Sequence, residues 1–191
     1  TRGLLNPQIG GPSVKPYMPP GIWSSISNAK YKQDKGEKLY RRSMYTYWRR
    51  TLPPPTMMAF NAAARETCIV RTDLTTTPLQ ALTLMNNITF VEASRHLAER
   101  VLTPEKLTPP QRIAQAFRTV TSRHPKPAEL RVLITDLTTY QKDFTNNPES
   151  ARQLLEVGEK PNAPTLDPTE LAAYTLITNT ILNLDESITA N

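Results

Sequence analysis

The sequence predicts a mainly helical protein, in which about five helices follow an extended, proline- and glycine-rich N-terminal strap. Two observations support this prediction. A helix-start signal recurs in the second half of the chain, where an N-cap residue is followed by proline and then by an amide or a carboxylate. Behind these signals, apolar residues recur at the i, i+3, i+4, i+7 spacing of a helix with one buried face.

Residues 1–36 are expected to form the strap, because Gly10-Gly11-Pro12 and Pro19-Pro20-Gly21 interrupt any regular element. The strap is too apolar for a free linker. Its apolar residues are Leu4, Leu5, Ile9, Val14, Tyr17, Ile22 and Trp23. Since little local sequence is left to pack against, we expect the strap to lie on a domain upstream of Thr1. A first residue that is not methionine leads to the same expectation, that the chain is the C-terminal part of a longer protein.

Residues 37–51 are ambiguous between helix and strand. Tyr40, Met44, Tyr47 and Trp48 fall near one face of a helix, whereas the Tyr, Thr and Trp content favours a strand. We favour a helix, with a short β-ribbon as the alternative. Pro53-Pro54-Pro55 should end either element.

Five helix starts are predicted, near residues 77, 108, 127, 148 and 168. The complete signal occurs at Thr77-Pro78-Leu79-Gln80, Thr108-Pro109-Pro110-Gln111 and Asp167-Pro168-Thr169-Glu170. Weaker versions occur at Lys126-Pro127 and Asn147-Pro148. The first helix should break near Asn86-Asn87, and the last should end around Asp185. Residues 37–191 are therefore expected to form one helical domain, with a basic aromatic segment at 37–72 and capped helices at 77–191.

Composition excludes several classes of protein. The hydrophobic fraction is 38% and the mean hydropathy is −0.46, with no apolar run of the roughly 18 residues that a membrane span needs. Cys68 is the one cysteine, so the segment can form no internal disulfide, no thiolate metal cluster and no covalent haem attachment. We expect no cofactor in this segment.

Charge is unevenly divided along the chain. Residues 1–72 hold twelve Lys or Arg against three acids, a balance of +9, whereas residues 73–191 hold eleven against fourteen, a balance of −3. The first third is thus the part that favours anionic partners.

Several long motifs resemble a known family. They are Ile9-Gly10-Gly11-Pro12-Ser13-Val14, Arg41-Arg42-Ser43-Met44-Tyr45-Thr46-Tyr47-Trp48-Arg49-Arg50-Thr51, Arg65-Glu66-Thr67-Cys68, Thr77-Pro78-Leu79-Gln80-Ala81-Leu82-Thr83-Leu84-Met85-Asn86 and Leu182-Asn183-Leu184-Asp185-Glu186. Together they resemble the planctomycete-type C-terminal domain of unknown function, the family numbered fifteen fifty-three (PSD type), over nearly the whole chain.

The resemblance implies where the protein is located and which domains accompany it, but it implies no reaction. Members of this family resemble the C-terminal part of long secreted bacterial proteins, which often carry a c-type cytochrome module upstream. This implies export to the periplasm or cell surface, haem c in an upstream module, and a link to polysaccharide utilisation or extracellular electron transfer. It supplies no catalytic residues for this sequence.

The candidate ligand- or partner-binding residues come from the basic aromatic segment and from the helix start that follows it. They are Arg41, Arg42, Tyr45, Tyr47, Trp48, Arg49, Arg50, Arg65, Arg71, Thr76 and Thr77. Arginines interleaved with aromatic rings suit anions and stacked rings, and a helix N-terminus suits a carboxylate or sulfate. The simpler interpretations are a solvated basic face packed on an acidic neighbouring domain, and an ordinary capped helix; we favour both.

Other reactive residues are interpreted as structural. Cys68, His96 and Glu66 could form a nucleophile, a base and an orienting acid, but nothing in their spacing requires them to meet, and a lone cysteine usually acts as a small buried hydrophobe. Glu92 and Glu99 share a helix face, and pairs of acids at this spacing are common on solvated helix surfaces.

The leading hypothesis is a non-catalytic C-terminal helical module that packs against upstream domains of the same exported protein. In the alternative, residues 40–71 supply substrate-binding groups to an active site shared with an upstream domain, which acts on a polysaccharide in concert with an electron-transfer module. The targets expected of the basic face itself are an acidic glycan or a partner domain. Polyanion or nucleic-acid binding through the basic region is the third hypothesis, and it lacks any nucleic-acid fold signature.

Overall fold

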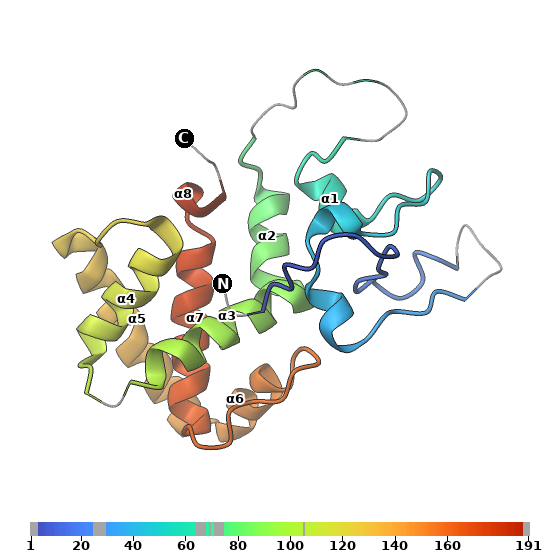
Figure 1. Ribbon diagram of the computed structural model, residues 1–191. Coiled ribbons are helices and arrows are strands. Elements are labelled where there is room, and N and C mark those ends of the chain that lie inside the picture. Colours follow the sequence, from blue (N-terminus) through green and yellow to red (C-terminus); the bar gives the residue numbers. More distant parts are fainter. Residues whose placement is uncertain are drawn as a thin grey trace. The chain divides into compact units, whose positions relative to one another are not determined.

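The computed structural model describes residues 4–24, 30–63, 68, 70, 75–104 and 106–188 (Figure 1). These residues form eight α-helices and two short 3-10 helices, and they contain no strand. The prediction of a mainly helical, multi-helix protein is therefore confirmed. None of the helices in the described ranges is both long and apolar enough to cross a membrane.

The chain divides into two compact units within a single helix, α2 (Pro78–Asn86). We call Leu4–Thr83 the N-terminal unit and Leu84–Asn191 the helical unit. The boundary predicted from the sequence lies at residue 36, where the strap was expected to end. The two differ because the strap and the basic aromatic segment contact each other and so belong to one unit.

Residues 37–51 do not form the α-helix that we favoured. They form two 3-10 helices, η1 (Gly36–Tyr40) and η2 (Ser43–Tyr45), and the next helix is the short α1 (Pro55–Ala59). The residues that follow the two turns, Arg41 and Thr46, have extended backbones and form isolated parallel bridges to Asn6 and Val14 of the strap. Backbone groups that pair with the strap cannot also pair within a helix, so the strap excludes the α-helix.

The predicted helix starts are confirmed. α2, α4 (Pro109–Thr121), α5 (Pro127–Asn146), α6 (Pro148–Leu155) and α7 (Pro168–Leu182) each begin at the proline of the signal. The break after Asn86 is also present, because Asn87 caps α3 (Ile88–Leu102) by accepting the Thr89 backbone N–H at 2.9 Å. A short helix that was not predicted, α8 (Asp185–Ile188), begins where the last long helix was expected to end.

α7 is the central helix of the helical unit and contacts α3, α4, α5, α6 and α8 (Figure 1). Its buried residues are Leu171, Ala172, Ala173, Tyr174, Thr175, Ile177, Thr178 and Ile181. A helix that is apolar or small on every side must be covered on every side. The sequence predicts one buried face for each helix, and α7 exceeds this prediction because its alanines and threonines can also be buried.

The loop after α6 is held to α3 by buried polar side chains. Glu92 Oε1 accepts the backbone N–H groups of Glu159 at 3.0 Å and Lys160 at 2.8 Å, and Arg95 Nη1 donates to the Leu155 carbonyl at 2.9 Å. Gly158 has φ +103°, and a Cβ there would lie 2.6 Å from the Glu92 carboxyl carbon. Glu92 is 5% exposed, so its interpretation as a solvated surface residue is wrong. The Glu92 carboxylate accepts the loop N–H groups that would otherwise need water as their hydrogen-bond partner.

Arg123 ties α8 to the corner between α4 and α5. It donates from Nη1 and Nη2 to the Glu129 carboxylate at 2.9 and 2.7 Å, and from Nε and Nη2 to the Glu186 carboxylate at 2.7 Å each. These hydrogen bonds, helped by the Lys126 backbone N–H, lower the pKa of Glu129 to about 2, and the Arg123 hydrogen bonds also lower the pKa of Glu186.

Truncation of α7 tests the importance of its burial. Ile177→Ala should lower the free energy of unfolding of the helical unit by about 3 kcal/mol, because Ile177 is fully buried and leaves a cavity. Val132→Ala, at a position 59% exposed, should change it by less than about 0.5 kcal/mol. Urea unfolding followed by circular dichroism measures both. Equal losses in the two variants would contradict a core built around α7.

The Arg123 contacts predict a pH dependence. Because the pKa of Glu129 is lower in the folded state than its ordinary 4.5, the stabilisation is complete above pH 4.5 and is lost as the pH falls towards about 2. In Arg123→Gln, the NMR titration of the Glu129 carboxyl carbon should move up towards its ordinary value. A wild-type Glu129 that already titrates near 4.5 would show that the contact does not persist in solution.

Candidate recognition surface

Arg41 joins the strap to the basic aromatic segment. Its guanidinium donates from Nη1 to the Pro12 carbonyl at 3.2 Å and from Nη2 to the Gln8 carbonyl at 3.1 Å, and Nη2 also donates to the Gly10 carbonyl. The guanidinium carbon lies 3.8 Å from the centre of the Tyr45 ring. Since arginine presents five donors in a planar fork, one side chain can hold three carbonyls of one turn. We call this set of contacts the Arg41 clasp.

Two glycines shape the turn that the clasp holds. Gly10 has φ +79° and Gly11 has φ +88°, in the region that residues with a Cβ rarely adopt. The Gly10 N–H also donates to the Tyr45 hydroxyl at 2.8 Å. Arg41 and Tyr45 are thus used to build the unit, and their contacts explain the Ile9-Gly10-Gly11-Pro12 motif.

The strap also pairs with the segment through its backbone. The Val14 N–H donates to the Tyr45 carbonyl at 2.8 Å, the Tyr47 N–H donates to the Val14 carbonyl at 2.7 Å, and the Asn6 N–H donates to the Tyr40 carbonyl at 2.8 Å. The argument that the strap lacks a partner within the chain is therefore wrong. That it also packs on an upstream domain stays a prediction.

Three aromatic rings and two cations gather beside the clasp. The Trp23 ring lies 5.0 Å from that of Tyr31 and 6.3 Å from that of Tyr47, measured between centres. Lys15 Nζ lies 5.1 Å from the centre of the Tyr47 ring, and the Arg49 guanidinium carbon lies 5.2 Å from that of Trp23. Both distances are within the range of cation–π attraction. We call these five residues the cation–aromatic cluster.

Tyr31 ties the cluster to the strap through its hydroxyl group. Its hydroxyl donates to the Pro16 carbonyl, and burial, with a smaller contribution from the negative charge of Asp34, raises its pKa to about 12. Asp34 in turn exchanges hydrogen bonds with Lys15, accepting the Lys15 N–H at 2.7 Å and donating its own N–H to the Lys15 carbonyl at 2.9 Å. The ring therefore stays neutral, and the strap that carries Lys15 is fixed at two points.

The cations of the cluster, Lys15 and Arg49, and the neighbouring Arg42 are not neutralised by nearby acids. Lys15, Arg42 and Arg49 form no ion pair with any residue that the structure describes, and Asp34 pairs instead with Lys38 at 3.7 Å. The described part of the N-terminal unit holds nine Lys or Arg and two acids. An excess of positive charge over aromatic rings is suited to holding an anionic group.

Of the other candidate binding residues predicted from the sequence, some reach solvent and two lie outside the described residues. Arg42 and Arg50 are exposed and Trp48 is half-buried, so the segment itself reaches solvent. Arg65 and Arg71 lie outside the described residues.

The predicted anion pocket at the start of α2 is occupied by the helix's own cap. The Thr77 N–H donates to Gln80 Oε1 at 2.9 Å, and the Gln80 N–H donates to Thr77 Oγ1 at 3.2 Å. This is the capping box that the sequence predicts. With Thr76 exposed beside it, the geometry favours an ordinary capped helix over an anion site.

Among the described residues, no group of three His, Cys, Asp or Glu could hold a metal ion. Cys68 is exposed, which corrects its interpretation as a buried hydrophobe. His96 Nδ1 lies 3.1 Å from Glu99 Oε2 on the same helix, a local contact. The arrangement of cations and aromatic rings in the N-terminal unit is suited to binding an anionic group.

Three residues of the cluster, Lys15, Trp23 and Tyr31, were not among the candidates from the sequence. Their aromatic and basic character is visible in the strap. Their association with Tyr47 and Arg49 is not, because it depends on contacts between positions up to 32 residues apart, from Lys15 to Tyr47.

Comparison with known proteins identifies a family. The family model PSD1, described as a protein of unknown function (DUF1553), matches residues 1–137, which is well over half of the chain. This confirms the family that the motifs resemble. The match does not test the planctomycete-type detail, and the closing Leu182–Glu186 motif lies beyond the matched residues. No match was found among curated proteins or among solved structures.

Replacement of Arg41 tests the clasp. Arg41→Lys keeps the charge but loses the planar fork, so the amide hydrogens of Val14 and Tyr47 should exchange with solvent roughly tenfold faster or more. Arg42→Lys, at the exposed neighbouring position, should leave both rates unchanged. Hydrogen exchange followed by NMR measures the rates. Unchanged protection in Arg41→Lys would show that the backbone pairs hold the strap without the clasp.

Proposed function

We propose that this chain, which belongs to the PSD1 family of proteins of unknown function (DUF1553), is a non-catalytic interaction module whose cation–aromatic cluster binds an acidic protein surface. In this proposal the acidic surface belongs to another domain of the same, longer protein. Export to the periplasm or cell surface, and a haem c module elsewhere in that protein, are parts of the same proposal and rest on the family resemblance.

The observation that carries the proposal is the geometry of the cluster. Lys15 and Arg49 are held over the rings of Tyr47 and Trp23 rather than beside carboxylates. Aromatic residues and arginine are enriched where proteins bind one another, because they bury large areas at a small cost in side-chain entropy. A partner that brings carboxylates would supply the charge that these cations lack.

Exposed apolar side chains support a protein as the partner. Leu5, Ile9 and Met44 are 54%, 83% and 60% exposed, and they belong to the strap and to the segment that it pairs with. The clasp fixes the backbone of this region but leaves these side chains in solvent. A protein surface with an apolar centre and an acidic rim would cover both features, whereas a hydrated polysaccharide would cover chiefly the charges.

Charge removal tests the proposal. Both tryptophans, Trp23 and Trp48, lie in the N-terminal unit, so their fluorescence reports binding there. Poly-L-glutamate, a protein-like polyanion, should bind the whole chain, and Arg42→Gln/Arg49→Gln should weaken its binding roughly tenfold. The matched control, Arg118→Gln/Arg131→Gln, removes two exposed charges from the helical unit and should change the affinity less than about twofold.

Two outcomes would overturn the proposal. Equal losses in the two double variants would mean that net charge, and not the cluster with the neighbouring Arg42, attracts the polyanion. Polygalacturonate binding more than about tenfold tighter than poly-L-glutamate would replace the protein partner with an acidic glycan.

A further inference from the structure

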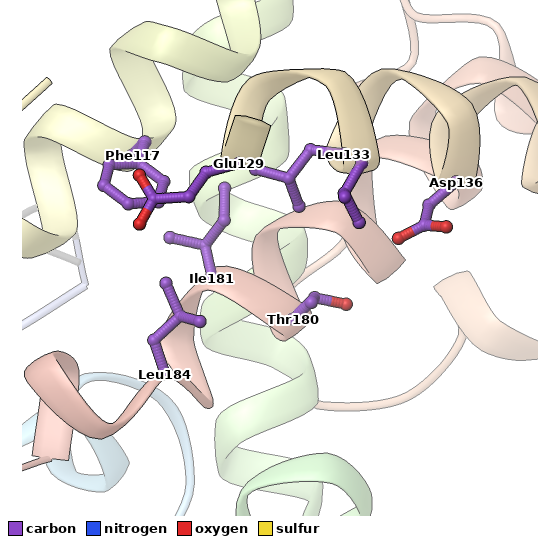
Figure 2. Close-up of a pocket in the computed structure, with 8 residues that line it drawn as sticks. Phe117, Glu129, Leu133, Asp136, Thr180, Ile181 and Leu184 are labelled. Carbon is purple, nitrogen blue, oxygen red and sulfur yellow. The ribbon is translucent and has the colours of Figure 1, made fainter. Parts of the chain in front are cut away.

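The helical unit contains an apolar pocket of about 230 Å³ between α4, α5 and α7 (Figure 2). Phe117, Leu133, Ile181 and Leu184 form its apolar walls. Val132 also lines the pocket and is 59% exposed, which places an aliphatic side chain in contact with solvent at the opening. The pocket is therefore open to small molecules.

The polar groups at the edge of this pocket are all hydrogen-bond acceptors. Figure 2 shows Asp136 and Thr180 at one end of the pocket, and Glu129 beside Phe117 at the other. Thr180 Oγ1 already donates its proton to the Leu176 carbonyl at 3.0 Å, so its oxygen is left to accept. A ligand that fits this edge must donate hydrogen bonds.

The Glu129 and Asp136 carboxylates differ in how many hydrogen-bond partners they already have. Glu129 accepts two hydrogen bonds from Arg123 and a third from the Lys126 N–H at 2.6 Å, so its charge and lone pairs are largely used. Asp136 makes no hydrogen bond or ion pair with any residue in the described ranges, although it is half-buried. The unmatched negative charge of the pocket is thus at the Asp136 end.

We propose that this pocket binds a small linear alkylammonium ion. The alkyl chain lies on Val132, Leu133 and Leu184, above the buried Ile181, and the ammonium group donates to the Asp136 carboxylate and to Thr180 Oγ1. Removal of the chain from water favours the complex, and the carboxylate selects the cation over a neutral ligand of the same length.

The surroundings favour a small ligand over a side chain from a protein partner. The volume is below the 300–1,000 Å³ typical of drug-sized sites, and Val132 is an isolated apolar residue on its exposed face. Around it, α5 presents the polar residues Arg131, Thr135, Thr138 and Thr139 to solvent. A protein would find no wider apolar area to bury here. All the residues involved belong to the helical unit, so this inference does not depend on the proposed function.

Titration of the whole chain with n-pentylammonium chloride tests the inference. Saturable NMR shifts should appear at Leu133, Ile181 and Leu184, with a Kd on the order of 1 mM. 1-Pentanol, which is similar in length but neutral, should bind at least about tenfold more weakly. Asp136→Asn should weaken pentylammonium binding about tenfold and leave 1-pentanol binding unchanged.

Asp143→Asn is the matched control, since it removes an exposed acid from the same helix without touching the pocket. It should leave both affinities unchanged. The inference is overturned if pentylammonium gives no saturable shift at millimolar concentrations, if 1-pentanol binds as tightly, or if the two Asp→Asn variants behave alike. Tighter binding of a lysine-containing peptide than of pentylammonium would also overturn it, because the occupant would then be a protein side chain.

Discussion

The N-terminal unit depends on one side chain, Arg41. Of its described residues, only Val14, Pro54 and Gln80 are buried, and it contains no strand, so neither a large core nor a sheet holds it together. The Arg41 guanidinium instead gathers three strap carbonyls, and two glycines with positive φ turn those carbonyls towards it. Once the strap is fixed, Lys15 and Trp23 are brought to Tyr47 and Arg49. The cluster therefore depends on the clasp, together with the backbone pairs of Val14 and the hydrogen bonds between Lys15 and Asp34.

The helical unit is held together in a different way, and this separates the roles of the two units. α7 is covered on every side by helices, and the polar groups on its neighbour α3 are used to secure a loop. The described part of this unit holds eleven Lys or Arg and twelve acids, so its charges nearly balance, and some pair directly, as at Arg123 with Glu129 and Glu186. The unit with a large apolar core supplies stability, and the unit with unmatched cations supplies the surface that we propose for recognition.

The sequence predicts the helices well because their signals are local. Each proline-marked start depends on residues within one turn, and so does the break at Asn86-Asn87. The basic aromatic segment could not be predicted in the same way. Tyr40 and Tyr45 hydrogen-bond through their backbones to strap residues about thirty positions away, and those long-range pairs override the helical spacing of their side chains. The same holds for the site: Tyr47 and Arg49 were recognised as candidates, whereas Lys15, Trp23 and Tyr31 join them only through the fold. Glu92 was misjudged because helix periodicity does not reveal the loop that covers it.

The central claim is that the cation–aromatic cluster is covered by a partner in the native protein. Backbone hydrogen exchange, measured by mass spectrometry on this chain alone and within the native protein purified from its source, tests this most directly. The account predicts slower exchange in the native protein across residues 42–50, with no change across the exposed face of α5. Identical exchange in residues 42–50 in the two samples would contradict it.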